Sequence, residues 1–292
     1  MSGTIVKIFG ERNTGTRALQ QMLRQVPGLR FRVESGTPVP GDAAVEAAIE
    51  TRMKGAWKRL YLHALRDEQA ALRAAHDPWK HAAPRLTPAM VAAGVRVLIL
   101  VRDPYSWLIG LARRPYHLKG PNERSLEEFA ARPWMTERRE GLAPVLASPV
   151  DLWALKAAAS LACRAEAKAR GLPCAILRFE DFVRDPGGAA TAALAQIGIE
   201  AEHLAPRQDN TKPGEDGLPL LQRYYRDRLW QARLTRETVA RVNARIDWAV
   251  AAELGYAPLD PERFPRVLPP ALQEQIAREM ACLTTPTDRA DA

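Results

Sequence analysis

The first two dozen residues constrain the fold more than any other part of this 292-residue chain. Residues 5–9 are a short apolar run with β-branched side chains, which is typical of a strand buried on both faces. Gly10 and Gly15 bracket a tight loop, and apolar residues from Leu19 on recur at helical spacing. A strand, a glycine loop and a helix in succession aim backbone N–H groups and a helix N-terminus at one point. Such a point favours a phosphate or a sulfate.

The spacing of the loop narrows the choice of ligand. Two glycines separated by four residues are the pattern of the P-loop, which continues with Lys and Ser/Thr to hold the phosphates and Mg²⁺. Here Gly15 is followed by Thr16 and Arg17, so the magnesium-holding pair is absent. A phosphate cradle without its magnesium ligand favours a donor whose transferred group carries little charge, such as the sulfuryl group of 3′-phosphoadenylyl sulfate (PAPS). The alternative interpretation is a glycine turn that only connects strand and helix.

The run from Gly10 to Leu23 resembles the 5′-phosphosulfate loop of the PAPS-dependent sulfotransferases. It is most similar to the branch that acts on glycans, where the loop reads Arg-Lys-x-Gly-Thr-Arg-Ala-Leu. The resemblance implies PAPS as donor, no metal, and a donor-binding loop made of Arg12, Asn13, Thr14, Gly15, Thr16 and Arg17. Asn13 stands where the family has a lysine that stabilises the bridging oxygen as the donor breaks. Arg12 or Arg17 is then expected to supply that charge.

Residues 77–84 contain the expected proton acceptor. Many sulfotransferases have Lys-x-His-x-Pro after a central strand, and that histidine deprotonates the acceptor hydroxyl. Here Lys80 and His81 precede Pro84, so the pattern is similar but its spacing is compressed. The resemblance implies that His81 is the base and that Lys80 reaches the sulfonate. A neighbouring lysine favours the neutral imidazole that a base requires. A surface histidine is the alternative interpretation, and His117 is the rival base.

Residues 95–101 form a second apolar run that predicts a buried parallel strand. An Asp-Pro pair follows Arg102 and is a good N-cap and first residue of a helix. Arg102 therefore lies at the carboxyl end of a strand, where α/β sheets bind ligands. The arrangement resembles the family's 3′-phosphate motif, in which the arginine binds the 3′-phosphate. The family's serine eight residues after the arginine is Gly110 here, and Ser106, one turn earlier on the same face, is the expected substitute.

The later part of the chain carries weaker signals. Residues 174–179 predict another buried strand, and Glu180 and Asp181 after it are expected to cap or orient neighbours. Arg207 and Lys212 lie in a polar loop that resembles the family's basic loop over the 3′-phosphate.

Composition limits the partners. A net charge of +8 and a pI near 9.7 suit anionic ligands. No basic stripe with interleaved aromatic residues is present, so nucleic acid is not an expected partner. The longest clean apolar run, residues 97–101, is far too short to span a bilayer. The three widely spaced cysteines and the absence of a secretory signal pattern predict reduced thiols in a cytoplasmic protein.

These patterns predict a single α/β domain, residues 1–257, with a central parallel sheet of four or five strands flanked by helices. Residues 258–292 are expected to form a C-terminal helical extension and a polar tail. Long helices are predicted at residues 43–75, 152–170, 218–230, 237–254 and 271–282. In the first of these helices Trp57, Leu60, Tyr61 and Leu65 are expected to pack in the core.

The predicted function is transfer of a sulfuryl group from PAPS to a hydroxyl or amine. Glycan, lipid, peptide and small phenolic acceptors all stay open, as does the oligomeric state. An ATP-dependent P-loop kinase is one alternative, which the residues after Gly15 disfavour. A non-catalytic nucleotide-binding protein of the same fold is another, because Asn13 and Gly110 are what a decayed site would contain.

Overall fold

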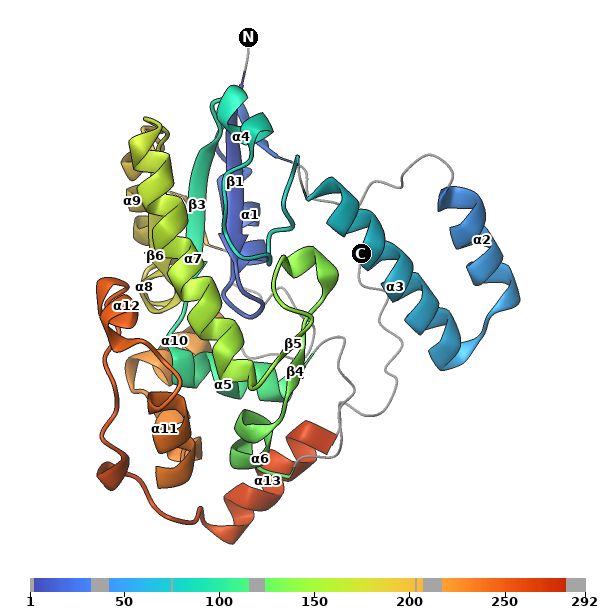
Figure 1. Cartoon of the computed structure of the whole chain (residues 1–292). Helices are drawn as coiled ribbons and strands as arrows, with labels where there is room; N and C mark the ends of the chain where they lie inside the picture. Colours follow the sequence, from blue (N-terminus) through green and yellow to red (C-terminus); the bar gives the residue numbers. More distant parts are fainter. Residues whose placement is uncertain are drawn as a thin grey trace.

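The computed structural model describes residues 3–32, 42–74, 76–115, 124–202, 204–206 and 217–281. A four-stranded sheet in the order β2-β1-β3-β6 lies at its centre, and all the neighbouring strands are parallel (Figure 1). These strands are β1 (Thr4–Gly10), β2 (Leu29–Phe31), β3 (Arg96–Val101) and β6 (Cys174–Arg178). The predicted α/β class, with a central parallel sheet flanked by helices, is confirmed.

Side chains alternate along β3 because successive residues of a strand point to opposite faces of the sheet. Leu98 and Leu100 pack with α1 (Thr16–Leu23) and α9 (Pro186–Gln196) on one face. On the other face, Val97, Ile99 and Val101 join the larger core, which includes α7 (Pro149–Ala169). Both faces are covered, which explains why the strands read as continuous apolar runs.

The other elements surround this sheet. They are α2 (Asp42–Arg52), α3 (Gly55–Arg73), α4 (Pro88–Ala92), α5 (Pro104–Arg113), α6 (Leu126–Ala131), β4 (Trp134–Met135), η1 (Arg138–Glu140), β5 (Val145–Leu146), α8 (Phe179–Arg184), α10 (Leu218–Arg226), η2 (Leu229–Arg233), α11 (Arg236–Asn243), α12 (Trp248–Glu253), η3 (Pro261–Arg263) and α13 (Pro270–Ala281). In α13, Ile276 and Met280 are buried against the main core. Among the described helices, none combines the length and the apolar character that crossing a membrane requires.

Two predicted long helices are each broken into two. The first ends at Arg52, and α3 starts at Gly55, whose φ of 59° is a left-handed conformation that glycine adopts at little cost. The second is interrupted before Asp247, whose carboxylate accepts a hydrogen bond from the N–H of Ala249 and so starts α12. Local backbone and capping chemistry therefore outweighs the helical periodicity at both points.

The predicted burial of the α3 aromatic residues is wrong. Trp57, Leu60 and Tyr61 are 67%, 56% and 46% exposed, and Leu65 is half-buried. In Figure 1, α2 and α3 stand to one side of the sheet, and the end of α3 that carries these residues projects from the body. Helical spacing shows that apolar side chains share a face, but it does not show whether another element covers that face.

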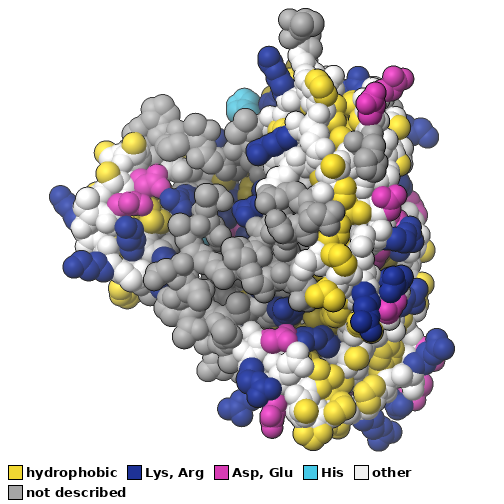
Figure 2. Space-filling model, turned by 180° about the vertical axis from the view of Figure 1, so that it is seen from behind, with side chains coloured by type: hydrophobic (Ala, Val, Ile, Leu, Met, Phe, Trp, Pro, Cys, Tyr) yellow, Lys and Arg dark blue, Asp and Glu magenta, His cyan; other side chains and the backbone are white. Residues whose placement is uncertain are grey.

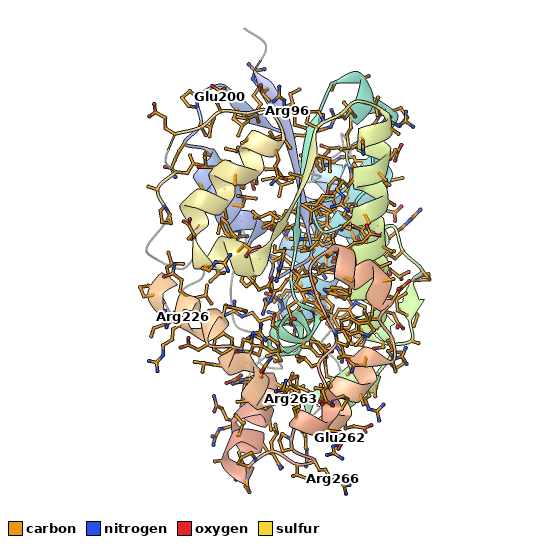
Figure 3. All side chains as sticks on the ribbon, turned by 90° about the vertical axis from the view of Figure 1, so that its left-hand side faces the viewer. Arg96, Glu200, Arg226, Glu262, Arg263 and Arg266 are labelled. Atoms are coloured by element: carbon orange, nitrogen blue, oxygen red, sulfur yellow. The ribbon has the colours of Figure 1, made fainter. Side chains whose placement is uncertain are left out.

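The carboxyl ends of the strands face the half of the molecule that contains the C-terminal helices. Figure 3 places Arg96, the first residue of β3, near one end, and Arg226 of α10 in the opposite half. In Figure 2, Lys and Arg side chains are spread over the described part of the back face, interspersed with Asp and Glu.

β1 contains a buried positive charge, on Lys7, which is stabilised by a carboxylate from a distant segment. The side chain of Lys7 is fully buried, and its Nζ lies 2.9 Å from Oδ1 of Asp77. Asp77 also pairs with Arg32, at 3.4 Å. A buried ammonium without its partner is strongly destabilising.

Asp77→Ala is therefore expected to lower the free energy of unfolding by about 3–5 kcal/mol, measured by urea denaturation. The matched control is Glu166→Ala, which removes an exposed i,i+4 pair with Arg170 and should cost no more than about 0.5 kcal/mol. Equal effects of the two substitutions would contradict the proposed dependence of β1 on Asp77.

Candidate active site

The loop after β1 is tightly folded. Asn13 and Gly15 have φ of 66° and 81°, both in the left-handed region. A Cβ on Gly10 would lie 2.7 Å from a methyl carbon of Thr16 and 2.8 Å from the hydroxyl of Thr14, so only glycine fits there. Asparagine adopts the left-handed conformation more readily than most residues with a side chain. This gives a local reason for Asn13 at the position where the sulfotransferase loop has lysine.

The N-terminus of α1 is open toward this loop. Gly15 is its N-cap and offers no side-chain cap. The first N–H groups of a helix have no acceptor within the helix, and together with the helix dipole they favour an anion. Arg17 lies exposed in the first turn of α1, while the Thr14 hydroxyl donates to the Glu11 carbonyl within the loop.

Arg102 lies at the same edge of the sheet as the loop because β1 and β3 are parallel neighbours. Their register pairs Gly10 with Leu100. The Arg102 guanidinium donates from NH1 to the Asn13 carbonyl at 2.7 Å and from Nε to the Ser106 hydroxyl at 3.1 Å. Asp103 caps α5 by accepting from the Ser106 N–H at 2.8 Å. The structure thus brings together the two motifs that the sequence keeps far apart.

The two departures from the family pattern contact each other. The Asn13 side-chain amide donates to the Gly110 carbonyl at 3.2 Å. A Cβ on Gly110 would lie 3.1 Å from NH1 of Arg102, so position 110 faces the guanidinium directly.

His81 is held beside the start of the loop. The Gly10 N–H donates to the Lys80 carbonyl at 2.9 Å, and His81 Nδ1 lies 2.6 Å from the Gly10 carbonyl. A carbonyl only accepts, so Nδ1 carries the proton, and Nε2 of the neutral ring keeps its lone pair. Burial lowers the His81 pKa well below its ordinary value, and the positive charges of Lys80 and Arg12 act in the same direction. The ring is therefore neutral with Nε2 available as a base.

Arg12 points away from the expected phosphate position. Its guanidinium pairs with the buried carboxylate of Glu137 and lies over the Trp79 ring, 4.7 Å from the centroid. Glu137 also pairs with Arg139 at 2.7 Å and with His63 Nε2 at 2.8 Å. The charge of Arg12 is thus largely offset by this carboxylate.

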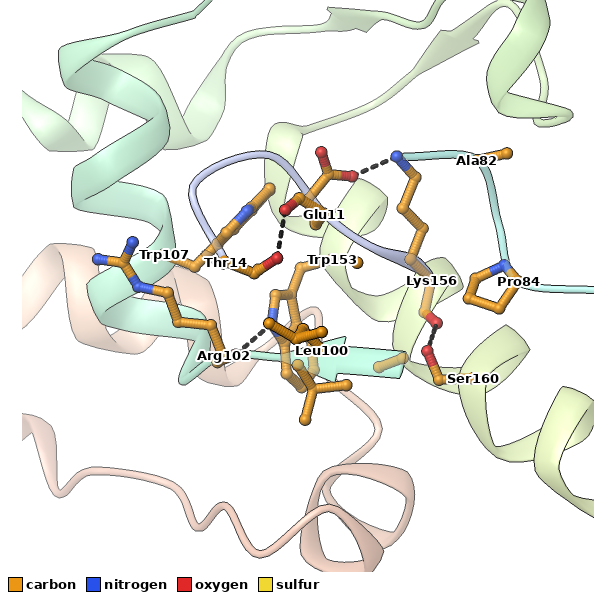
Figure 4. Close-up of a pocket in the computed structure, with 13 residues that line it drawn as sticks. Glu11, Thr14, Ala82, Pro84, Leu100, Arg102, Trp107, Trp153, Lys156 and Ser160 are labelled. Atoms are coloured by element: carbon orange, nitrogen blue, oxygen red, sulfur yellow. Dashed lines mark hydrogen bonds and ion pairs between the residues drawn. The ribbon is translucent and has the colours of Figure 1, made fainter. Parts of the chain in front are cut away.

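A buried lysine joins three segments of the site. Nζ of Lys156, on α7, donates to the Glu11 carboxylate in the loop (Figure 4). It also donates to the His81 carbonyl at 2.6 Å and to Glu140 in η1 at 2.7 Å. A cavity of about 30 Å³ lies beside it, lined by Glu11, Thr14 and Ser160 among others. Gly10 and Arg102 also line this cavity, so it lies between the loop and the end of β3.

The sequence analysis missed Lys156, Glu137, His63 and Tyr225, whose hydroxyl accepts a hydrogen bond from Arg102. Lys156 had a signal, because it is the only charged residue in the apolar stretch 152–163. The others had none, since their partners come from distant segments. Of the predicted residues, Lys212, Arg207 and His117 lie outside the described residues.

No protein-family model and no curated protein matches the chain. Among solved structures, the chain is similar to the crystal structure of a sulfotransferase from Alicyclobacillus acidocaldarius, with 19% sequence identity and a TM-score of 0.37. The likeness covers 86% of this chain and 100% of that one. Identity and TM-score this low do not identify an activity, which has to come from the chemistry of the site.

The lowered pKa of His81 predicts a pH dependence of stability. As the pH falls below about 6.5, the unfolded state binds the proton before the folded state does, so stability is fully present above that pH and declines below it. His81→Asn, which keeps a side-chain N–H for the Gly10 carbonyl, should flatten this decline in urea denaturation between about pH 7.5 and about pH 5. His76→Asn, at an exposed histidine, should follow the wild type. Parallel curves for all three proteins would contradict the assignment.

Proposed function

We propose that this chain is a sulfotransferase that moves a sulfuryl group from PAPS to a hydroxyl or amine of its acceptor. The observation that carries the proposal is the hydrogen bond between Arg102 NH1 and the Asn13 carbonyl, 2.7 Å long. It holds two anion-binding elements side by side: the open N-terminus of α1 and an arginine at the end of β3. A nucleotide with phosphate groups at both its 5′ and 3′ positions matches such a pair.

In this proposal the donor binds along the edge of the sheet. The loop Arg12, Asn13, Thr14, Gly15, Thr16 and Arg17 holds the 5′-phosphosulfate through backbone N–H groups. Arg102, which Ser106 holds in place, forms the 3′-phosphate site, to which Lys212 is added on the strength of the sequence alone. Arg17 and the helix dipole offset the charge of the leaving bisphosphate. Arg12 contributes less because Glu137 already pairs with it.

The chemistry needs one proton acceptor. The acceptor oxygen or nitrogen attacks sulfur while His81 Nε2 takes its proton, and the bond between sulfur and the phosphate oxygen breaks. Its electron pair leaves with adenosine 3′,5′-bisphosphate. Lys80, next to His81 in the chain, is expected to neutralise the sulfonate oxygens. The contributions of these residues are positioning and electrostatic stabilisation.

The alternatives are less well supported. A P-loop kinase needs a Lys-Ser/Thr pair after the second glycine, and this chain has Thr16 and Arg17 there instead. A decayed site does not account for a histidine held neutral with Nε2 available, or for Asn13 and Gly110 contacting each other. The likeness of the loop to the glycan branch makes glycans the first acceptor class to assay.

Adenosine 3′,5′-bisphosphate without metal is expected to raise the melting temperature. At a hundred times its Kd a ligand adds about 2.7 kcal/mol, which is about 5–10 °C for a chain of this size. ATP with Mg²⁺ should stabilise much less, because the loop has no magnesium-holding pair. A larger shift with Mg-ATP would favour the kinase.

His81→Ala is expected to lower turnover by about 100-fold or more once an acceptor is found, with bisphosphate affinity unchanged, because the base touches the acceptor. His63→Ala is the matched control: this half-exposed histidine pairs with Glu137 and should affect turnover little. If His81→Ala is fully active while His63→Ala or His117→Ala is not, the base is another histidine, and the donor assignment still stands.

A further inference from the structure

The guanidinium of Arg102 lies between two aromatic rings. Its Cζ is 4.8 Å from the ring centroid of Phe179 and 5.2 Å from that of Tyr225. Phe179 starts α8, directly after β6, and Tyr225 lies on α10. The two rings meet at 4.9 Å in an edge-to-face arrangement. Tyr225 is therefore held against Arg102 by packing as well as by its hydroxyl.

Most of the donors of Arg102 are already used. An arginine has five N–H donors. Nε donates to the Ser106 hydroxyl, NH2 donates to the Ser106 carbonyl and to the Tyr225 hydroxyl, and NH1 donates to the Asn13 carbonyl. Among the residues that the structure describes, this leaves one hydrogen on NH1, the nitrogen that position 110 faces.

The Ser106 hydroxyl is also committed. It accepts from Arg102 Nε and donates to the Asp103 carbonyl at 3.3 Å, within the first turn of α5. Its two contacts therefore hold the arginine in place and leave no hydrogen for a ligand.

The Tyr225 hydroxyl is in a different state. It accepts from Arg102, and its own hydrogen has no acceptor among the described residues. Burial raises the pKa of Tyr225 to about 12, so the hydroxyl stays protonated at neutral pH. The phenol hydrogen and the remaining guanidinium hydrogen belong to two groups that are bonded to each other, and neither has an acceptor in the described part of the chain. Such a pair of donors suits an anionic oxygen.

We infer that the hydroxyl of Tyr225, and not that of Ser106, donates a hydrogen bond to the 3′-phosphate of the donor. It acts with the remaining NH1 hydrogen of Arg102 and replaces the side chain that is absent at Gly110. Ser106 is a positioning residue that orients Arg102 through the hydrogen bonds to its hydroxyl and its carbonyl. This inference rests on the proposed sulfotransferase function, because that function supplies the 3′-phosphate.

The test compares two ligands that differ only in the 3′-phosphate. Calorimetry gives the affinities of adenosine 3′,5′-bisphosphate and of adenosine 5′-monophosphate, and their ratio isolates the contribution of that group. Tyr225→Phe keeps the ring and removes the hydroxyl, and it is expected to lower the ratio about tenfold or more, as for loss of a hydrogen bond to a charged group. The affinity for the monophosphate should hardly change.

Two variants complete the design. Tyr224→Phe is the matched control, since its ring lies next to that of Tyr225 at 5.3 Å and its hydroxyl is given no role; its ratio should equal that of the wild type. Ser106→Ala should lower the ratio less than Tyr225→Phe does, because Arg102 keeps its bonds to the Asn13 and Ser106 carbonyls. Unliganded melting temperatures confirm that each variant is folded.

The outcomes separate the two proposals. If the wild type prefers the bisphosphate and Tyr225→Phe keeps the same preference, the role of Tyr225 is overturned. The proposed sulfotransferase function is then unaffected. A larger loss in Ser106→Ala than in Tyr225→Phe overturns it too and returns the role to Ser106. A wild type with no preference for the bisphosphate overturns the donor assignment, and the role of Tyr225 with it.

Discussion

The parallel pairing of β1 with β3 is the constraint on which the site depends. Parallel neighbours end at the same edge of a sheet, so the loop after Gly10 and the turn after Val101 have to meet. The helix that follows each strand then starts at that edge with its unpaired N–H groups. Arg102 joins the two turns by donating to the Asn13 carbonyl. The proposed function depends on this juxtaposition, because a doubly phosphorylated nucleotide needs both motifs.

Buried charge positions the other half of the site. Lys156 binds the loop after β1 through Glu11, the segment at residues 80–81 through the His81 carbonyl, and η1 through Glu140. Removing one member of such a cluster leaves an uncompensated charge in a poorly hydrated place, so these segments are fixed relative to one another. Beside this cluster, the buried carboxylate of Glu137 pairs with Arg12 and offsets its charge.

Local patterns predicted the central strands, the loop and the cap at Asp103, because each depends on residues close in sequence. Patterns failed where a distant element decides. The helical spacing of apolar residues in α3 predicts a buried face, but that face is exposed because no described element covers Trp57. The pairing of Arg12 with Glu137 could not be predicted from the sequence either, because the two residues are 125 positions apart in the chain.

The sequence alone determined that a glycine loop without a magnesium-holding pair joins the first strand to the first helix and that an arginine follows a central strand. Glycine spacing, β-branched runs and an Asp-Pro cap are local chemistry that any fold must respect. Only the tertiary structure decided which hydroxyl stands free beside Arg102. Ser106 is four residues from Arg102 in the chain, and its hydroxyl donates within its own helical turn. Tyr225 lies on α10, and its hydroxyl hydrogen has no acceptor among the described residues. Hydrogen-bond satisfaction depends on every neighbour in space, and sequence spacing reports only those nearby in the chain.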